Sequence, residues 1–245
     1  CPGLVDLAAH LPGLEGELAA AVAGGVTSLA CPPDGRPPLD EPGLVERLVR
    51  RTADAGLARV LPVGALTVGL KGEALAELGS LARAGCVAFS QGSNSPIVDT
   101  QVLLRALQYA TTFGYTLFLQ PQDKFLARDG VAHDGEVASR LGLPGIPAAA
   151  ESVAIATALE LVRSTGARLH FTRLSSAAGV ALLQRARDEG LPVSADIGIH
   201  HLHLTDMDIG YFDSAARFNP PLRAQRDREA LAAAAASGLA AICSD

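Results

Sequence analysis

Along most of the chain, stretches with apolar residues at helical spacing alternate with short apolar runs. In residues 44–51 the four apolar side chains share one helical face, and the charged side chains lie on the other. Residues 102–109 and 153–162 show the same pattern. The spacing predicts amphipathic helices in all three stretches.

A glycine ends each helical stretch, and a short apolar run follows it. A helix that must stop and turn back along a sheet favours a left-handed residue at its end, which glycine adopts without a Cβ clash. The runs are apolar almost throughout, as in parallel strands that are buried on both faces. With an initial run at 4–8, the predicted strands are 26–30, 57–63, 86–90, 115–119, 167–171, 191–195 and 239–243.

Eight parallel strands with seven intervening helices predict a (βα)8 TIM-type barrel, and 245 residues match its usual length of about 250. We expect one barrel domain over residues 1–245. The chain stops on the eighth strand, without an eighth helix, and begins almost on the first strand. We therefore expect a sequence trimmed at both ends.

Two connections are long, at 120–150 and 198–223. They follow the fifth and seventh strands and leave the carboxyl ends of those strands, where barrels carry their functional sites.

Composition narrows the class of protein. A net charge of −6 with a pI near 5.5 argues against nucleic acid or an anionic membrane as a partner. Neither an apolar run long enough to span a bilayer nor a signal peptide is present in this sequence. Cys1, Cys31, Cys86 and Cys243 form no CxxC pair, which favours reduced, mostly buried thiols and a cytoplasmic protein.

Several motifs resemble the dihydroorotases of the amidohydrolase superfamily, and they occur in family order from the first residue to the last. The segments are 2–6, 37–40, 61–72, 135–147, 219–223 and 227–231, which include Pro37-Pro38-Leu39-Asp40, Gly69-Leu70-Lys71-Gly72 and Asn219-Pro220-Pro221-Leu222-Arg223. The resemblance implies the superfamily's barrel. The family's flanking β-rich segment and C-terminal extension are not found in this sequence.

Dihydroorotases use one or two zinc ions to activate water and polarise the carbonyl of a cyclic amide. The resemblance places the zinc ligands at strand ends, and two of those positions keep a ligand type, His10 and Asp245. The other ligand positions are degenerate and are occupied by Ala8, Gln91, Gln120 and Arg173.

These replacements oppose zinc binding for chemical reasons. Alanine has no lone pair, a neutral glutamine amide is a poor donor, and Arg173 brings a fixed positive charge. Because a catalytic zinc usually needs three protein ligands, we expect neither a metal nor a cofactor.

Most of the residues that contact substrate in the family are also replaced in this sequence. The family's carboxylate-binding arginine has no counterpart after His10, and its Asn-Thr-Asn reads Asp34-Gly35-Arg36. Asn219 alone matches the substrate-contacting set. Arg36 could hold a carboxylate from a different angle.

The remaining residues also have a structural interpretation. Asp6 and His10 share one strand face by period two, and we expect them to be buried in a hydrogen-bond network. Because the side chains of adjacent residues diverge, the run of His200, His201 and His203 is expected to have a structural role and not to bind a metal. Asn219 before two prolines is typical of a turn.

The resemblance extends furthest to the inactive dihydroorotase homologues that partner aspartate transcarbamoylase. It implies a pseudoenzyme without catalytic residues, whose vestigial site contains His10, Asp245, Asn219 and Asp6. We expect it to form a hetero-oligomer with the catalytic chain of aspartate transcarbamoylase in pyrimidine biosynthesis.

Two alternatives stay open. One is an active zinc-dependent dihydroorotase, or a related cyclic amidohydrolase, that uses unusual ligands such as His170 or His200. The other is a small-molecule sensor that uses the vacated barrel mouth.

A last expectation concerns Arg173. If no zinc is bound, Asp245 and Asp6 need another positive charge. We predict that the Arg173 guanidinium supplies it, within about 4 Å of one of these carboxylates. The alternative is that Arg173 extends to solvent.

Overall fold

The computed structural model describes residues 2–92, 96 and 99–244. Its contacts divide the chain into two compact units, which are described separately. Unit 1 contains residues 1–118 and 243–245, and unit 2 contains residues 119–242.

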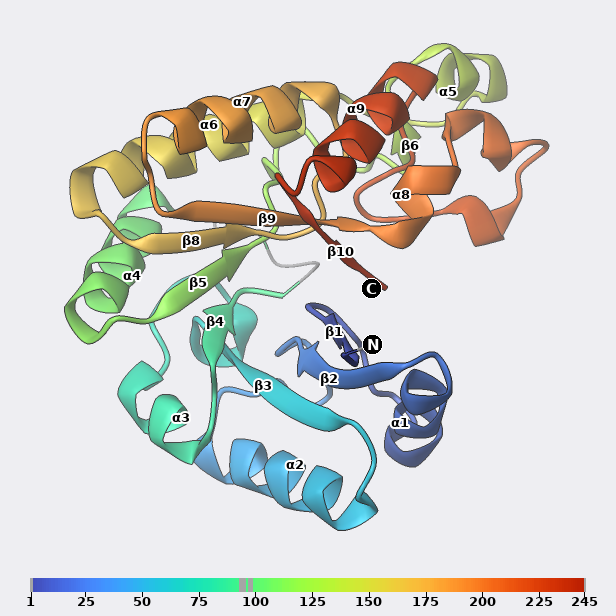
Figure 1. The fold of residues 1–245 in the computed structure, drawn as a ribbon. Coiled ribbons are helices and arrows are strands. Elements are labelled where there is room, and N and C mark those ends of the chain that lie inside the picture. Colours follow the sequence, from blue (N-terminus) through green and yellow to red (C-terminus); the bar gives the residue numbers. More distant parts are fainter. Residues whose placement is uncertain (1, 93–95, 97–98, 245) are drawn as a thin grey trace. The chain divides into compact units, whose positions relative to one another are not determined.

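Unit 1 carries parallel strands in the order β1 to β5, and a helix follows each of β1 to β4 (Figure 1). Helices α2 and α3 lie beside each other and pack along β3. The strands are β1 (Leu4–Asp6), β2 (Val26–Cys31), β3 (Arg59–Ala65), β4 (Ala88–Ser90) and β5 (Thr116–Leu119). The helices are α1 (Leu14–Ala23), α2 (Pro42–Ala55), the 3-10 turn η1 (Val68–Leu70), α3 (Leu78–Ala84) and α4 (Thr100–Phe113).

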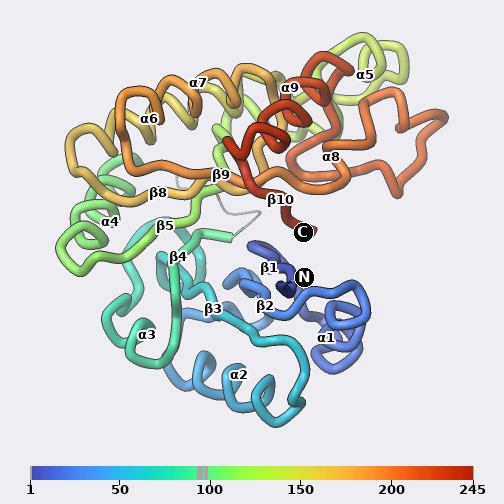
Figure 2. Tube along the Cα trace, viewed as in Figure 1, coloured from blue at the N-terminus to red at the C-terminus, as the bar shows by residue number. Residues whose placement is uncertain are grey.

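Unit 2 continues the pattern with neighbouring strands β8, β9 and β10. Helices α6 and α7 lie side by side, and α7 also contacts α9 (Figures 1 and 2). The elements are α6 (Ala149–Thr165), β8 (Arg168–Phe171), α7 (Ala177–Asp188), β9 (Val193–Gly198), α9 (Gln225–Ala236) and β10 (Ala241–Cys243).

The two long connections contain short elements that the hydrophobic pattern did not predict. The first holds a two-residue parallel pair around a helix: β6 (Ala132–His133), α5 (Glu136–Leu141) and β7 (Gly145–Ile146). The second holds α8 (Ile199–His203) and the turns η2 (Asp206–Ile209) and η3 (Ser214–Ala216). Elements this short carry too few residues for a readable period.

All eight predicted strands and the helices between them are present. The predicted glycine ends are also confirmed: Gly56 closes α2 with φ 64° and Gly166 closes α6 with φ 68°. Both backbones are left-handed, where a side chain would add strain.

Burial of the strands is confirmed only in part. All three residues of β4 are buried. In β1, by contrast, Leu4 and Val5 are 60% and 57% exposed, and in β10 Ile242 is 45% exposed. An apolar strand is buried only where a neighbouring element covers its face, and the local pattern does not contain that information.

Candidate functional site

Two positions at which the sequence resemblance places zinc ligands follow β5 and β8, and their side chains bond directly to each other. Arg173 Nη2 donates to Gln120 Oε1 at 2.5 Å, and both side chains are buried. Gln120 Nε2 in turn donates to Gln122 Oε1 at 3.0 Å and to Asn219 Oδ1 at 3.3 Å. We call Gln120, Arg173 and Asn219, with Asp196, the strand-end cluster.

Asp196 joins this cluster through its fully buried carboxylate. Arg173 N donates to Asp196 Oδ1 at 2.6 Å, which holds Arg173 at the left-handed φ of 56°. His170 Nε2 lies 2.9 Å from Asp196 Oδ2, and His170 Nδ1 lies 2.8 Å from Ser194 Oγ. Both ring nitrogens of His170 are therefore engaged, which opposes its use as a metal ligand.

The prediction for Arg173 is tested only in part. Its side chain is 6% exposed, so the alternative that it extends to solvent is wrong. Asp245 lies outside the described residues, and Asp6 belongs to the other unit. The predicted ion pair therefore stays a prediction.

In unit 1, Asp6 and His10 lie in different environments. Asp6 is buried, and it accepts hydrogen bonds from Ala8 N at 3.2 Å and from the backbone and hydroxyl of Ser244. The side chain of His10 is 41% exposed, and its Nε2 lies 3.1 Å from Asp34 Oδ1. The expected burial of Asp6 is confirmed, and that of His10 is wrong, because the chain leaves the strand after Asp6 and period two no longer applies.

The other degenerate positions of unit 1 offer no charged ligand. Ala8 is buried and has only a methyl group. Gln91 is 2% exposed; its Oε1 accepts from Thr67 Oγ1 at 2.8 Å, and its Nε2 has no hydrogen-bond partner. In the described part of the chain, no three His, Cys, Asp or Glu side chains are placed to hold one metal ion.

The histidine run has the structural role expected of it. His201 is buried, its Nε2 lies 3.3 Å from Pro221 O, and burial lowers its pKa to about 3. His200 stacks on Phe218 at a centroid distance of 4.1 Å. Burial raises the pKa of Cys31 to about 11 and of Cys86 to about 12, so these thiols are unreactive, as the sequence predicts.

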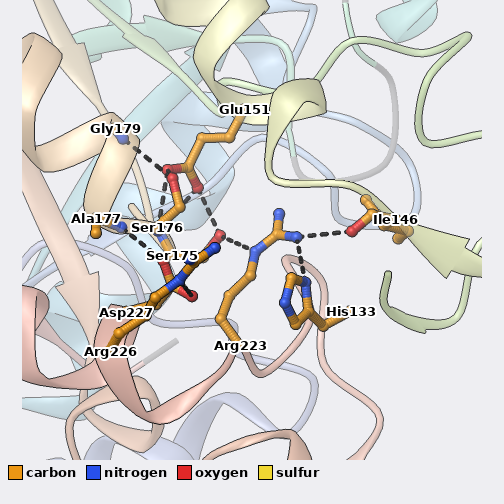
Figure 3. Close-up of polar contacts among 10 residues, drawn as sticks. All are labelled: His133, Ile146, Glu151, Ser175, Ser176, Ala177, Gly179, Arg223, Arg226 and Asp227. Atoms are coloured by element: carbon orange, nitrogen blue, oxygen red, sulfur yellow. Dashed lines mark hydrogen bonds and ion pairs between the residues drawn. The ribbon is translucent and has the colours of Figure 1, made fainter. Parts of the chain in front are cut away.

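A second cluster in unit 2, the Glu151 cluster, was not singled out from the sequence (Figure 3). Glu151 lies in the first turn of α6 and is 2% exposed. Its Oε2 accepts from Ser175 N at 2.8 Å and from Ser175 Oγ at 2.5 Å. Its Oε1 accepts from Ser176 N at 3.0 Å and from Ser176 Oγ at 2.5 Å.

Arg223 connects this carboxylate to the first long connection. Its Nε donates to Ser175 Oγ at 3.1 Å, and its Nη1 donates to Ile146 O at 2.7 Å and to His133 Nδ1 at 3.2 Å (Figure 3). Burial raises the pKa of Glu151 and lowers that of Arg223. Burial and the Arg223 charge lower the pKa of His133, which keeps Nδ1 available as an acceptor.

The Glu151 cluster joins segments that the resemblance had singled out. Ile146 belongs to the 135–147 motif, Arg223 ends the Asn-Pro-Pro-Leu-Arg motif, and Asp227 accepts from Ala177 N at 2.9 Å. In unit 1, similarly, Gly69 N donates to Asp40 Oδ2 at 2.7 Å. These motifs therefore hold loops together. Glu151 has one sequence signal, a lone acid within the apolar run 146–159.

Comparison with known proteins places these observations in context. The family model described as "Dihydro-orotase-like" matches residues 1–178. The chain is 48% identical to a "Dihydroorotase-like protein" of Pseudomonas putida, covering 97% of this chain and 58% of that protein. It is 43% identical to a dihydroorotase of Anaeromyxobacter dehalogenans, covering 100% of this chain and 59% of that one.

Solved structures give the fold. The chain resembles L-hydantoinase from Arthrobacter aurescens with a TM-score of 0.83 and 22% identity, covering 100% of this chain and 57% of that one. It resembles Saccharomyces cerevisiae dihydroorotase with a TM-score of 0.74 and 17% identity, covering 97% and 66%. The predicted TIM-type amidohydrolase fold class is confirmed. The chain spans little more than half the length of the curated relatives named here.

No helix among the described residues is long and apolar enough to cross a bilayer.

Proposed function

The chain belongs to the dihydroorotase-like family, and we propose that it is a non-catalytic, metal-free member. Its proposed role is that of the structural subunit that assembles with the catalytic chain of aspartate transcarbamoylase in pyrimidine biosynthesis. The observation that carries this proposal is the hydrogen bond between Arg173 and Gln120. Two positions at which the family resemblance places zinc ligands bond to each other.

The donor set does not fit zinc. A guanidinium is permanently charged and has no lone pair to donate, so Arg173 at a ligand position repels a cation. Gln120 Oε1 is occupied by that guanidinium, and Ala8 offers no donor atom. The proposed protein therefore has no zinc-activated water for hydrolysis.

The proposed partner rests on the family resemblance and is supported by exposed apolar side chains. Met207, Tyr211 and Phe212 lie within six residues of the second long connection and are 62%, 91% and 51% exposed. Exposed apolar side chains that lie close together are typical of surfaces that another protein covers.

Metal content and turnover test the first half of the proposal. The purified protein is expected to hold no stoichiometric zinc by elemental analysis after gel filtration. It is also expected to show no dihydroorotate hydrolysis above background. The dihydroorotase of Anaeromyxobacter dehalogenans, prepared in parallel, is the positive control. One bound zinc per chain, with hydrolysis that Asp245→Ala abolishes, would contradict the proposal and favour the active-enzyme alternative.

Restoring one ligand is not expected to restore activity. Ala8→His adds a single imidazole, while Gln91, Gln120 and Arg173 remain, and catalytic groups that act as a unit do not contribute additively. Zinc-dependent turnover in this variant would show that the site is nearly intact.

Co-expression tests the partner. The aspartate transcarbamoylase catalytic chain of the same organism is expressed alone and together with the protein described here. The proposal predicts that the two proteins co-purify and that the catalytic chain reaches full assembly and activity only in the complex. A catalytic chain that is fully active and normally assembled alone, and that does not bind this protein at micromolar concentration, would refute the role.

A further inference from the structure

A pocket formed by residues of unit 1 has a basic wall. It measures about 620 Å³ and is formed by the segments that follow β1 and β2 and by helix α2. This volume lies within the range of about 300–1,000 Å³ that is typical of small-molecule sites. All of its lining residues belong to unit 1.

Helix α2 lines the pocket with a stripe of side chains at the border between its apolar and charged faces. Leu44, Arg47, Leu48 and Arg51 are spaced at i, i+3, i+4 and i+7, so they lie in one stripe of α2. Leu44 and Leu48 belong to the apolar face of the helix, and Arg47 and Arg51 belong to its charged face. Both arginines are exposed.

In the part of the chain that the structure describes, no ion pair neutralises the positive charge of this wall. Arg47 and Arg51 are four residues apart, where like charges repel, and Arg36 adds a third guanidinium from the segment after β2. Among the described residues, no carboxylate lies within ion-pair distance of Arg36, Arg47 or Arg51. Asp34, the one acidic residue that lines the pocket, contacts His10.

The charge of the pocket contrasts with that of the whole protein. Three arginines and one aspartate line the pocket, whereas the whole chain has a net charge of −6. The remaining wall includes the apolar side chains of Leu11, Leu44 and Leu48. Leu11 and Leu48 pack against the core between α1, β2 and β3, so the apolar part of the pocket lies against buried core residues.

We propose that this pocket binds a small organic anion, with Arg36, Arg47 and Arg51 holding its charged groups and the leucines contacting its apolar body. The guanidinium fork matches the oxygen geometry of both carboxylate and phosphate. The ligand class is therefore a phosphate ester or a polycarboxylate of up to nucleotide size. This inference does not depend on the proposed assembly role.

Calorimetric titration tests the site with three probes at low salt. Adenosine 5′-monophosphate presents a phosphate ester on an apolar body, citrate presents carboxylates, and adenosine is the uncharged control. At least one of the two anions is expected to bind saturably and adenosine is not, because the guanidiniums supply the attraction. Binding of the nucleotide alone identifies a phosphate site, binding of citrate alone a carboxylate site, and binding of both a general anion site.

Helix α2 offers a matched control variant. Arg50 is exposed on the same helix but does not line the pocket. The double variant Arg47→Gln/Arg51→Gln is expected to raise the Kd of the bound anion by about tenfold or more, whereas Arg50→Gln leaves it nearly unchanged. Circular dichroism checks that both variants keep the fold.

Three results would overturn the proposal. They are the absence of saturable binding of either anion at millimolar concentration, equal binding of adenosine, and an equal loss of affinity in Arg50→Gln. Each would show that the arginines form only a solvated helix face.

Discussion

Two buried polar clusters in unit 2 differ in what their charged groups bond to. In the Glu151 cluster, the carboxylate accepts four hydrogen bonds from Ser175 and Ser176, and Arg223 joins it to distant backbone. In the strand-end cluster, Arg173 donates to the neutral amide of Gln120. The Glu151 cluster thus surrounds a buried carboxylate with matched donors, whereas the strand-end cluster pairs two residues at positions where the family resemblance expects metal ligands.

The two clusters contain two different sets of family positions, the motif segments and the degenerate ligand positions. Three motif segments of the dihydroorotase resemblance, 135–147, 219–223 and 227–231, contribute to the Glu151 cluster and hold loops together, which a barrel requires whether or not it catalyses a reaction. Two of the degenerate ligand positions, Gln120 and Arg173, meet in the strand-end cluster, where their side chains are hydrogen-bonded to each other. The contacts of the Glu151 cluster therefore need no metal ion at the positions where the resemblance places zinc ligands.

The largest effect is expected from breaking the Glu151 cluster with Arg223→Ala. The substitution removes the nearby positive charge and the donor to Ser175 Oγ, and it leaves Glu151 as a buried carboxylate without a cationic neighbour. Removing the positive charge that compensates a buried carboxylate costs about 3–5 kcal/mol of unfolding free energy. Urea denaturation measures the loss, and Arg140→Ala, at an exposed position on α5, is the control. A loss below about 1 kcal/mol would show that the cluster contributes little to stability.

Arg173→Ala tests the strand-end cluster and is expected to cost about 3 kcal/mol, because the side chain is buried and hydrogen-bonded. Double-mutant cycles with Asp245→Asn and with Asp6→Asn then test the predicted ion pair. A coupling energy of about 1 kcal/mol or more in one cycle supports it. Additive effects in both cycles would contradict the prediction that Arg173 compensates these carboxylates.

A pair of glycine variants makes the test of the Glu151 cluster more specific. A Cβ at Gly179, the third residue of α7, would overlap with Glu151 Oε1. We expect Gly179→Ala to cost about 1–3 kcal/mol through the displaced carboxylate. Gly16 is likewise the third residue of α1, and a Cβ there meets nothing within 4 Å. Gly16→Ala is expected to be neutral or stabilising by up to about 1 kcal/mol. Equal effects of the two variants would contradict the steric argument.

The smallest effect concerns pH and His201. Its pKa is lowered from 6.5 to about 3 in the folded protein, so below about pH 6.5 the unfolded chain binds a proton that the folded chain does not. The free energy of unfolding therefore falls as the pH falls through this window, by at most about 1.4 kcal/mol per pH unit from this residue. His201→Gln, which can keep a donor near Pro221 O, is expected to flatten the profile between pH 6.5 and pH 4.5. Parallel profiles of the two proteins would contradict the assignment.

Much of the fold could be predicted from the sequence because the patterns that indicate helices and their ends lie within short segments of the chain. Helices α2, α4 and α6 follow from the spacing of their apolar residues, and glycines such as Gly56 and Gly166 have the left-handed backbone expected of them. The prediction fails where an element is short, as in β6 and β7, and where burial depends on a covering neighbour, as at Leu4 and Val5.

For the candidate site, the sequence determined which side chains occupy the positions where the resemblance places zinc ligands, and it predicts that Ala8, Gln91, Gln120 and Arg173 do not bind zinc. Side-chain chemistry is a property of the residue and needs no coordinates. Only the tertiary structure decided that Arg173 bonds to Gln120, that His10 is exposed, and that Glu151 meets Ser175 and the Arg223 network. These contacts join residues distant in sequence, and their partners are fixed only when strands and connections pack together.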